Sequence, residues 1–367
     1  MPGRFGQKIL GALGDALGVE IAIEPQLPGK AVIRNDEHLL SAHPENGTYP
    51  RLAKLSDGSI LSSYTHFEGP TRFLKVARST DGGGRFTDWG LVTQGNGDVD
   101  NMYLHEVKPP GTVLAAFRNH DLGPHGPTWF RITLCQSRDG GRTWSYLTQV
   151  TEKGREPGFP LGIWEPFMRT GRQGEVQLTF SQEFAPDDQR TMMTRSFDQG
   201  HTWTPPVCIA GAEERLRDGM TGIAETHDNG REALVLVFET TRFGKFNLEA
   251  IISYDDGNSW HCRHIVYTPR QGRCAGSPQI ASFADGSMAV TFMTDEDILV
   301  PAWPGRSETK VVFAGPPRNG RIQWSKSKLV SPDSSIWPGI TALEGQRALA
   351  TFDHGGPKCK SITWGPK

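Results

Sequence analysis

The sequence predicts an all-β protein, built as a six-bladed β-propeller from one repeated four-stranded unit. Two observations predict this fold: a short turn motif recurs four times at nearly equal spacing, and six strand–turn–strand patterns alternate with it along the 367 residues. The 43 glycines and 10 tryptophans fit the same class, because β-rich repeat proteins need many tight turns and bulky residues between their sheets.

The repeated turn motif reads S-x-D-x-G-x-x-(W/F). Its copies "STDGGGRF", "SRDGGRTW", "SFDQGHTW" and "SYDDGNSW" start 57 to 59 residues apart, at Ser79, Ser137, Ser196 and Ser253, and a degraded fifth copy ends at Trp324. In such a turn the aspartate accepts backbone N–H bonds, the glycine supplies a positive φ, and the aromatic residue packs between sheets. The motif therefore indicates a structural repeat and not a binding site.

Apolar alternation on both sides of a short turn forms the second repeated element. It occurs in the ranges 52–64, 107–119, 171–183, 229–241, 281–297 and 343–355. Six hairpins interleaved with five turn motifs give six four-stranded sheets, with the two termini sharing the last blade. We assign residues 31–367 to a single propeller domain, and residues 1–30 to an N-terminal extension that wraps the outside.

Composition excludes several classes of function. The formal net charge is −2, and this near-neutral balance gives no electrostatic footprint for nucleic acid. No apolar run reaches about 18 residues, so the sequence predicts no transmembrane helix. We expect no nucleic-acid partner, no membrane partner and a monomer.

Metal and cofactor signals are weak. The 11 histidines are scattered, and no H-x-x-x-H or H-E-x-x-H pattern occurs, so we expect neither a metal nor a cofactor. Oxygen ligands in "TDED" at 294–297 leave calcium as a minor alternative. The five cysteines lack paired spacing and are interpreted as buried thiols with at most one disulfide.

Two rows of polar residues flank the hairpins. The motifs "TYPRL", "DNMYL", "IWEPF", "RDGMT", "GSPQI" and "IWPGI" precede them. A polar cluster follows each hairpin, including Arg118–Asp121 in the second repeat and Asp353–His354 in the sixth. Because the innermost strands of a propeller surround its axis, both rows are predicted to meet at one mouth of the molecule.

Two glutamates in these rows are the predicted catalytic pair. Glu165 lies among apolar neighbours in "GFPLGIWEPFMRTG", and Glu239 ends the apolar strand "LVLVFETT". Paired carboxyl groups, one protonated and one ionised, are the catalytic groups that most glycoside hydrolases use. Apolar surroundings favour Glu165 as the acid, and the nearby Arg242 favours Glu239 as the nucleophile. The assignment rests on sequence neighbours, and the reverse order stays open.

Further polar and aromatic residues in the same rows are candidates for the substrate pocket. A carboxylate or an arginine in such a row is otherwise explained by hydrogen bonds within the protein. The predicted substrate-binding residues are Arg118, Asn119, His120, Trp164 and Asp218.

The repeated turn resembles the "Asp box" of sialidase-like propellers, a resemblance that concerns fold. Sialidases need an early "RIP"-type arginine motif and a nucleophilic tyrosine in the last blade. Here the early motif is "YPRL", and no tyrosine follows Tyr267. The sequence therefore disfavours a sialidase.

From about residue 47 to about residue 355 the chain resembles glycoside hydrolase family 93, the exo-acting α-L-arabinanases of fungi. The resemblance is carried in order by "TYPRL…LSDGSIL", "AFRNHD", "RITLCQSRDGGRTW", "WEPFMR", "RDGM", "VFE", "VYTP", "SPQ…MTDED" and "WPGI". It implies that Glu165 and Glu239 form the catalytic pair. It further implies retention of configuration and release of arabinobiose from the non-reducing end of α-1,5-linked arabinan.

The resemblance also implies an extracellular protein. The N-terminal "MPGRFGQKILGALGDALGVEIAI" makes a poor signal peptide, because Asp15 and Glu20 interrupt its apolar stretch. Two alternatives to the arabinanase remain: a non-catalytic glycan-binding propeller, and a sialidase-like hydrolase of another glycoside.

Overall fold

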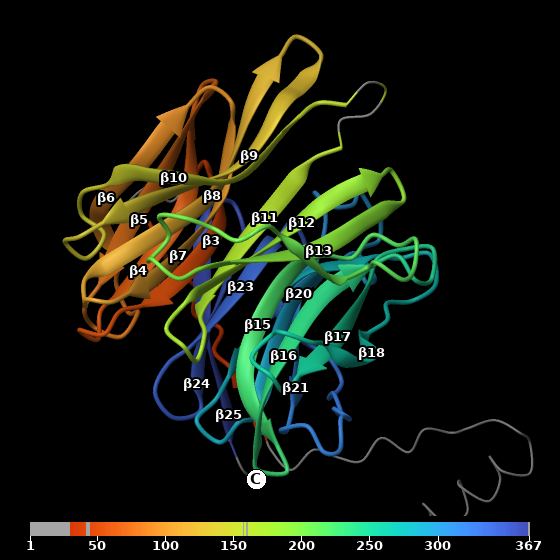
Figure 1. Cartoon of the computed structure of the whole chain (residues 1–367). Coiled ribbons are helices and arrows are strands. Elements are labelled where there is room, and N and C mark those ends of the chain that lie inside the picture. Colours follow the sequence, from red (N-terminus) through yellow and green to blue (C-terminus); the bar gives the residue numbers. More distant parts are fainter. Residues whose placement is uncertain (1–29, 42–44, 157, 159–160, 366–367) are drawn as a thin grey trace, which may run out of the picture.

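A computed structural model of the chain describes residues 30–41, 45–156, 158 and 161–365. In these ranges it contains strands and no helix, and the strands form six antiparallel sheets that follow one another around the molecule in chain order (Figure 1). Five sheets have four strands and the sixth has five. The predicted all-β, six-bladed propeller is confirmed.

In each of the first three blades the strands run from the innermost outwards. Blade 1 consists of β3 (Gly47–Lys54), β4 (Ile60–Glu68), β5 (Thr71–Ser79) and β6 (Thr87–Gly95). Blade 2 consists of β7 (Asp98–Val107), β8 (Thr112–Gly123), β9 (Gly126–Ser137) and β10 (Ser145–Gly154). Blade 3 consists of β11 (Ile163–Thr170), β12 (Val176–Ala185), β13 (Asp188–Ser196) and β14 (Val207–Ala210).

The second half of the propeller repeats this order. Blade 4 consists of β15 (Gly219–Asp228), β16 (Arg231–Thr240), β17 (Asn247–Ser253) and β18 (His261–Tyr267). Blade 5 consists of β19 (Ala275–Ser282), β20 (Met288–Thr294), β21 (Glu308–Ala314) and β22 (Lys328–Ser331). Blade 6 consists of β23 (Ile336–Ala342), β24 (Arg347–Asp353), β25 (Pro357–Gly365) and β1 (Lys30–Ile33), with β2 (His38–Leu39) also paired to β25.

The ring closes through the chain ends, as predicted. Strand β1 pairs antiparallel with β25, from Lys30 opposite Gly365 to Ile33 opposite Ile362, and the orange first blade lies beside the blue last blade in Figure 1. The first propeller strand thus begins at Lys30, one residue before the predicted boundary. The predicted N-terminal extension falls on residues outside the described ranges.

The apolar core lies between neighbouring blades. Val235 and Val237 of blade 4, for example, pack with Val290 and Phe292 of blade 5 in one fully buried cluster. Since each sheet buries both faces in this way, the strands carry apolar residues on both sides.

The repeated turn has the predicted hydrogen bonds. In its second copy the Asp139 carboxylate accepts the N–H groups of Arg142 and Thr143 at 3.1 and 2.9 Å, and Trp144 donates to the carbonyl of Gly141 at 2.8 Å. Every copy joins the third strand of a blade to the fourth, at the end where the innermost strand finishes. The motif therefore lies at the opposite end from the two polar rows.

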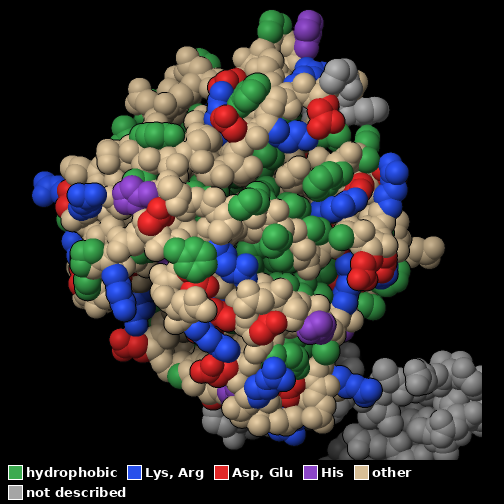
Figure 2. Space-filling model, in the orientation of Figure 1, with side chains coloured by type: hydrophobic (Ala, Val, Ile, Leu, Met, Phe, Trp, Pro, Cys, Tyr) green, Lys and Arg blue, Asp and Glu red, His purple; other side chains and the backbone are tan. Residues whose placement is uncertain are grey.

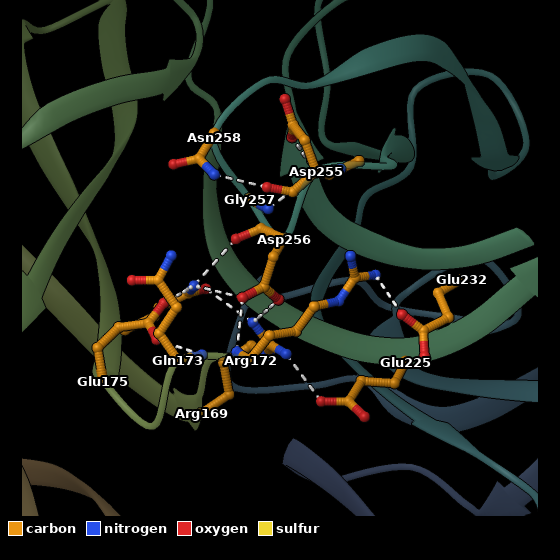
Figure 3. A network of polar contacts seen from close by, with 12 residues as sticks. Arg169, Arg172, Gln173, Glu175, Glu225, Glu232, Asp255, Asp256, Gly257 and Asn258 are labelled. Carbon is orange, nitrogen blue, oxygen red and sulfur yellow. Dashed lines mark hydrogen bonds and ion pairs between the residues drawn. The ribbon is translucent and has the colours of Figure 1, made fainter.

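A polar network connects blades 3 and 4 at the end of the propeller that carries the repeated turns, which we call the structural end (Figure 3). The buried Arg169 of β11 donates to Gln177, to Asp256 and to Glu225 of β15, each at 2.8 Å. Asp256 belongs to the fourth repeated turn. A buried arginine shared by three acceptors fixes the spacing of the two blades.

All six innermost strands contain the same β-bulge near their first residues, where the pairing register shifts. At each bulge one non-glycine residue has φ between 46° and 52°. We call these six residues the axial ring: Tyr49, Asn101, Glu165, Met220, Ser277 and Trp337. A left-handed backbone of this kind costs energy and re-aims the side chain.

The cysteines follow the prediction in part. All five are free thiols, and Cys135, Cys274 and Cys359 are buried. Cys262 is exposed and Cys208 is half-buried, so the expectation that all five are buried was wrong for these two.

Candidate active site

The ends of two strands bring the predicted glutamates to one mouth of the propeller. Glu165 lies near the start of β11, at the bulge of blade 3, and Glu239 lies near the end of β16 in blade 4, opposite Gly219. The starts of the innermost strands and the ends of the second strands share the same end of each antiparallel hairpin. The charge of Glu165 raises the pKa of Glu239, which identifies the two as electrostatic neighbours.

Glu165 is half-buried and is held by the axial bulge with φ of 46°. Burial raises its pKa to about 7, against the lowering effects of the Arg118 guanidinium and the Ser181 hydroxyl. Its Oε2 atom is buried and has no hydrogen-bond partner among the described residues. A buried carboxylate oxygen without a partner is an unusual feature in a folded protein and marks this position as a candidate for ligand binding.

Glu239 is more deeply buried, with 9% of its surface exposed. Its Oε2 accepts the backbone N–H of Ser277 at 2.7 Å, across the boundary between blades 4 and 5. Burial, reinforced by the charge of Glu165, raises its pKa to about 8. A carboxyl group in this position keeps its proton at neutral pH.

The charged groups that act on the two glutamates differ from their neighbours in sequence. Arg242 was expected to ionise Glu239, but its guanidinium binds Glu249 at 2.7 Å and Glu214 at 2.7 and 3.1 Å. The arginines that act on the pair are instead Arg118, which lowers the pKa of Glu165, and Arg217, which lowers the pKa of both glutamates. Burial raises the pKa of both carboxyl groups, to about 7 for Glu165 and about 8 for Glu239.

Arg118 lies close enough to Glu165 to lower the pKa of that carboxyl group. Its guanidinium is bound by Asp98 at 3.0 Å and Asp100 at 3.3 Å, and it lies over the rings of Tyr49 and Trp164 at 5.6 and 5.5 Å. Its Nε atom is buried without a partner among the described residues. Trp164, also predicted, is half-buried and forms one wall beside this cation.

His120 and Asn119 do not reach the mouth, so their predicted contact with substrate is not supported. His120 is fully buried, bonds the carbonyl of Ile163 through Nε2 at 2.9 Å, and packs edge-on against Trp164. Desolvation lowers its pKa to about 4, so the ring is neutral and supports the tryptophan. Asn119 alternates to the other face of β8 and bonds Thr133 at 3.1 Å.

Asp218 is likewise withdrawn from substrate, which corrects its predicted role. It is fully buried, and its carboxylate accepts two bonds from Arg263 on the outermost strand, at 2.6 and 3.2 Å. Because this carboxylate is fully buried and already paired, a sugar hydroxyl at the mouth has no access to it.

Several residues at the mouth were missed as candidates. The rings of Tyr49 and Trp337 stack at 4.5 Å across the junction of blades 1 and 6, and Asn101 is buried with its Nδ2 unpartnered among the described residues. Below them the buried Arg51 donates to the carbonyl oxygens of Pro50 and Trp337 at 2.9 and 3.0 Å. A sequence signal existed, since proline follows the ring residue in four of the six axial motifs.

The described residues hold no group of three or more His, Cys, Asp or Glu side chains that could bind a metal ion. At the "TDED" stretch an amine takes the place that a cation would need: Lys310 binds Glu296, Asp297 and Glu308 at 2.5, 2.6 and 2.8 Å. The calcium alternative therefore has no support from these residues.

The surface carries no large area of one charge on the face shown in Figure 2, where acidic and basic side chains are interspersed. Within the described part of the chain, no helix is long and apolar enough to cross a membrane.

The fold has close counterparts among solved structures. An α-L-arabinofuranosidase of glycoside hydrolase family 93 from Fusarium graminearum, in complex with arabinobiose, superposes with a TM-score of 0.65 at 20% identity, over 90% of this chain and 96% of that chain. An α-L-arabinanase from Penicillium chrysogenum, also with arabinobiose, gives 0.64 at 17% identity, over 92% and 98%. The NanB sialidase from Streptococcus pneumoniae gives 0.57 at 12% identity, over 96% and 72%.

No protein-family model matches the chain, and no curated protein sequence matches it. At these identities the structural likeness shows the propeller fold, and function has to be argued from the mouth itself.

Proposed function

We propose that the protein is a retaining exo-α-L-arabinanase of the glycoside hydrolase family 93 type, which releases arabinobiose from the non-reducing end of α-1,5-linked arabinan. The observation that carries the proposal is the Glu165–Glu239 pair. Two carboxyl groups on adjacent blades both have a raised pKa, and the charge of Glu165 contributes to the rise for Glu239. Such a pair provides one acid and one carboxylate at the same mouth. The two arabinobiose complexes among the structural neighbours support the choice of sugar.

The reaction would proceed by double displacement. The Glu165 carboxylate, next to Arg118, attacks the anomeric carbon while the Glu239 carboxyl group gives its proton to the leaving glycosidic oxygen, so that the C–O bond breaks and a glycosyl ester forms. In the second step the Glu239 carboxylate takes a proton from water, and the water oxygen replaces the Glu165 oxygen on the anomeric carbon. The net result is hydrolysis with retained configuration.

The surrounding residues suit a sugar ring. The stacked Tyr49 and Trp337 rings offer an apolar surface for the C–H face of a furanose, and Arg118 and Asn101 offer buried donors for its hydroxyl groups. Arg51 is 5% exposed and binds backbone carbonyls of blades 1 and 6, so it joins the two blades that carry these rings.

Product analysis on linear arabinan tests the proposal. We expect purified protein to release arabinobiose as the first product, detected by anion-exchange chromatography, and a Glu165→Gln variant to release none. Binding of arabinan without any product would instead establish the non-catalytic glycan-binding alternative.

The alternative of another glycoside, including a sialoside, is favoured by the sialidase among the neighbours. Burial raises the pKa of Tyr49, the tyrosine of the axial ring, which disfavours it as a nucleophile. A panel of aryl glycosides that contains an α-sialoside separates these cases, because only the preferred glycone releases the aryl group rapidly.

The pH dependence of activity follows from the coupled pair. Catalysis needs one protonated and one ionised carboxyl group, and this form is most populated between the pKa of about 7 for Glu165 and about 8 for Glu239. We expect a bell-shaped profile of kcat/KM with its maximum between these values, because both groups are protonated at lower pH and both are ionised at higher pH. Initial rates from pH 4 to 10 measure it, and a maximum below pH 5 would contradict this protonation scheme.

Secretion and a monomeric state remain predictions. Fractionation of the native host culture and light scattering of the purified protein test them.

A further inference from the structure

One arginine on the outermost strand of blade 4 makes contacts that extend across the whole sheet. Arg263 of β18 donates from Nε to Glu249 of β17 at 2.5 Å and from Nη1 and Nη2 to Asp218 at 2.6 and 3.2 Å, and its Nη2 lies 3.3 Å from the hydroxyl of Thr240 in β16. Asp218 directly precedes β15. A single guanidinium therefore joins residues from, or next to, all four strands of the blade.

These contacts involve the residues next to Glu239 in the sheet, and Arg263 does not contact Glu239 itself. Thr240 follows Glu239, the Arg263 guanidinium lies 4.9 Å from the ring centre of the preceding Phe238, and Gly219, the cross-strand partner of Glu239, directly follows Asp218. Side chains alternate between the two faces of a strand, so Glu239 points to the face opposite Phe238 and Thr240. Arg263 thus holds the backbone on both sides of the glutamate.

The buried carboxylates that Arg263 binds depend on its positive charge. Asp218 is fully buried and Glu249 is 1% exposed, and the cations that face them are Arg263 and, on Glu249, Arg242, which also binds Glu214. Removing one partner of a buried ion pair leaves an uncompensated charge that the structure must move to solvate. The residues that would move are the neighbours of Glu239.

We propose that Arg263 is a positioning residue for Glu239: by binding Asp218, Thr240 and Glu249 together, it sets the position of the strand end that presents the glutamate to the mouth. This inference rests on the proposed function, in which Glu239 is the acid–base group. It explains why the polar "RDGM" motif stands among the axial rows although its aspartate faces away from the mouth.

A cavity next to Arg263 makes the proposal testable by chemical rescue. Arg263 lines a cavity of about 420 Å³ between the outer strands of blades 3 and 4, together with Glu214, Trp260 and Cys208. In an Arg263→Ala variant, free guanidinium ion can enter through this cavity and occupy the place of the lost side chain.

The network in Figure 3 supplies a matched control. Arg169 is also a buried arginine with three side-chain acceptors, and it lies in β11, the strand of Glu165, but at the structural end of the propeller. Arg169→Ala should lower the thermal midpoint as Arg263→Ala does, and should leave kcat and the pH profile as in the wild type.

The experiment compares wild type, Arg263→Ala, Arg263→Lys and Arg169→Ala on the substrate that the wild type cleaves. We expect Arg263→Ala to lower kcat about 10²-fold, the size of effect that a small displacement of a catalytic group produces, with little change in KM. Millimolar guanidinium should restore activity to Arg263→Ala and leave the wild type unchanged. Arg263→Lys, which keeps the buried positive charge, should fold and retain an intermediate kcat.

Titration of the Glu239 carboxyl carbon by NMR gives a readout that does not require turnover. Loss of the neighbouring positive charge should shift its pKa upward in Arg263→Ala, and guanidinium should reverse the shift. Unchanged kcat and an unchanged titration in Arg263→Ala would overturn the proposal, as would an equal loss of kcat in Arg169→Ala. A wild type without glycosidase activity would refute the proposed function, while the titration would still decide whether Arg263 positions Glu239.

Discussion

Replacing Glu165 or Glu239 with alanine is expected to lower kcat on linear arabinan by about 10³-fold or more, since each variant lacks one of the two groups that the double displacement needs. The two variants should differ when an aryl arabinobioside, whose leaving group needs no proton, is supplied with azide. Glu239→Ala should keep substantial activity on this substrate, and Glu165→Ala should depend on azide. The rate of nitrophenolate release measures both effects.

The configuration of the azide product decides the roles. In Glu165→Ala, azide attacks the anomeric carbon directly and gives a β-arabinosyl azide, while in Glu239→Ala it attacks the glycosyl ester on Glu165 and gives an α-azide. The opposite pairing of variant and product would show that Glu165 is the acid, as its sequence neighbours alone suggest. A matched control is Glu225→Gln, which changes an exposed carboxylate at the structural end of the propeller and should leave kcat unchanged.

Gly276→Ala is expected to lower kcat about 10²-fold and to lower the thermal midpoint only slightly. A β-carbon at this position would lie 2.5 Å from the Glu239 Oε2 atom and 3.0 Å from the Trp303 ring. The backbone at Gly276 is not left-handed, so alanine can adopt the conformation and the collision with Glu239 is the main effect. The glutamate must rotate away from Ser277 N–H and from the mouth, which misplaces the acid.

Gly315→Ala is the control for this substitution. Gly315 also has an ordinary φ, and a β-carbon there would meet no atom within 4 Å, so activity and thermal midpoint should stay as in the wild type. Equal kcat for Gly276→Ala and wild type would show that the Glu239 position beside Ser277 is not the catalytic one.

The fold was largely predictable because its signals are local. Each copy of the turn motif contains its own hydrogen-bonding groups, as the bonds of Asp139 to Arg142 and Thr143 illustrate, and strand alternation reports burial within a few residues. Equal spacing of the copies then determines the number of blades, and the pairing of β1 with β25 follows from the need to close the ring.

The candidate site was predictable in part. Placement of Glu165 and Glu239 in equivalent rows of adjacent blades marked them, and Arg118 and Trp164 do lie beside Glu165. Sequence distance misled the assignment of Arg242, which is three residues from Glu239 yet binds Glu249 and Glu214. The side-chain direction of His120, toward Trp164 and Phe130, depends on the packing of blade 2 against blade 3.

The sequence by itself determined the propeller, the number of blades and the end at which chemistry is expected, because turn chemistry and strand periodicity act over a few residues and repeat. Only the tertiary structure decided which polar residues face the mouth and which arginines act on the two glutamates. Asp218 forms an ion pair with Arg263, 45 residues away, and the register shift between Trp164 and Phe167 accompanies the left-handed backbone of Glu165. Charge and direction at the mouth depend on such contacts between distant residues, which a local pattern does not encode.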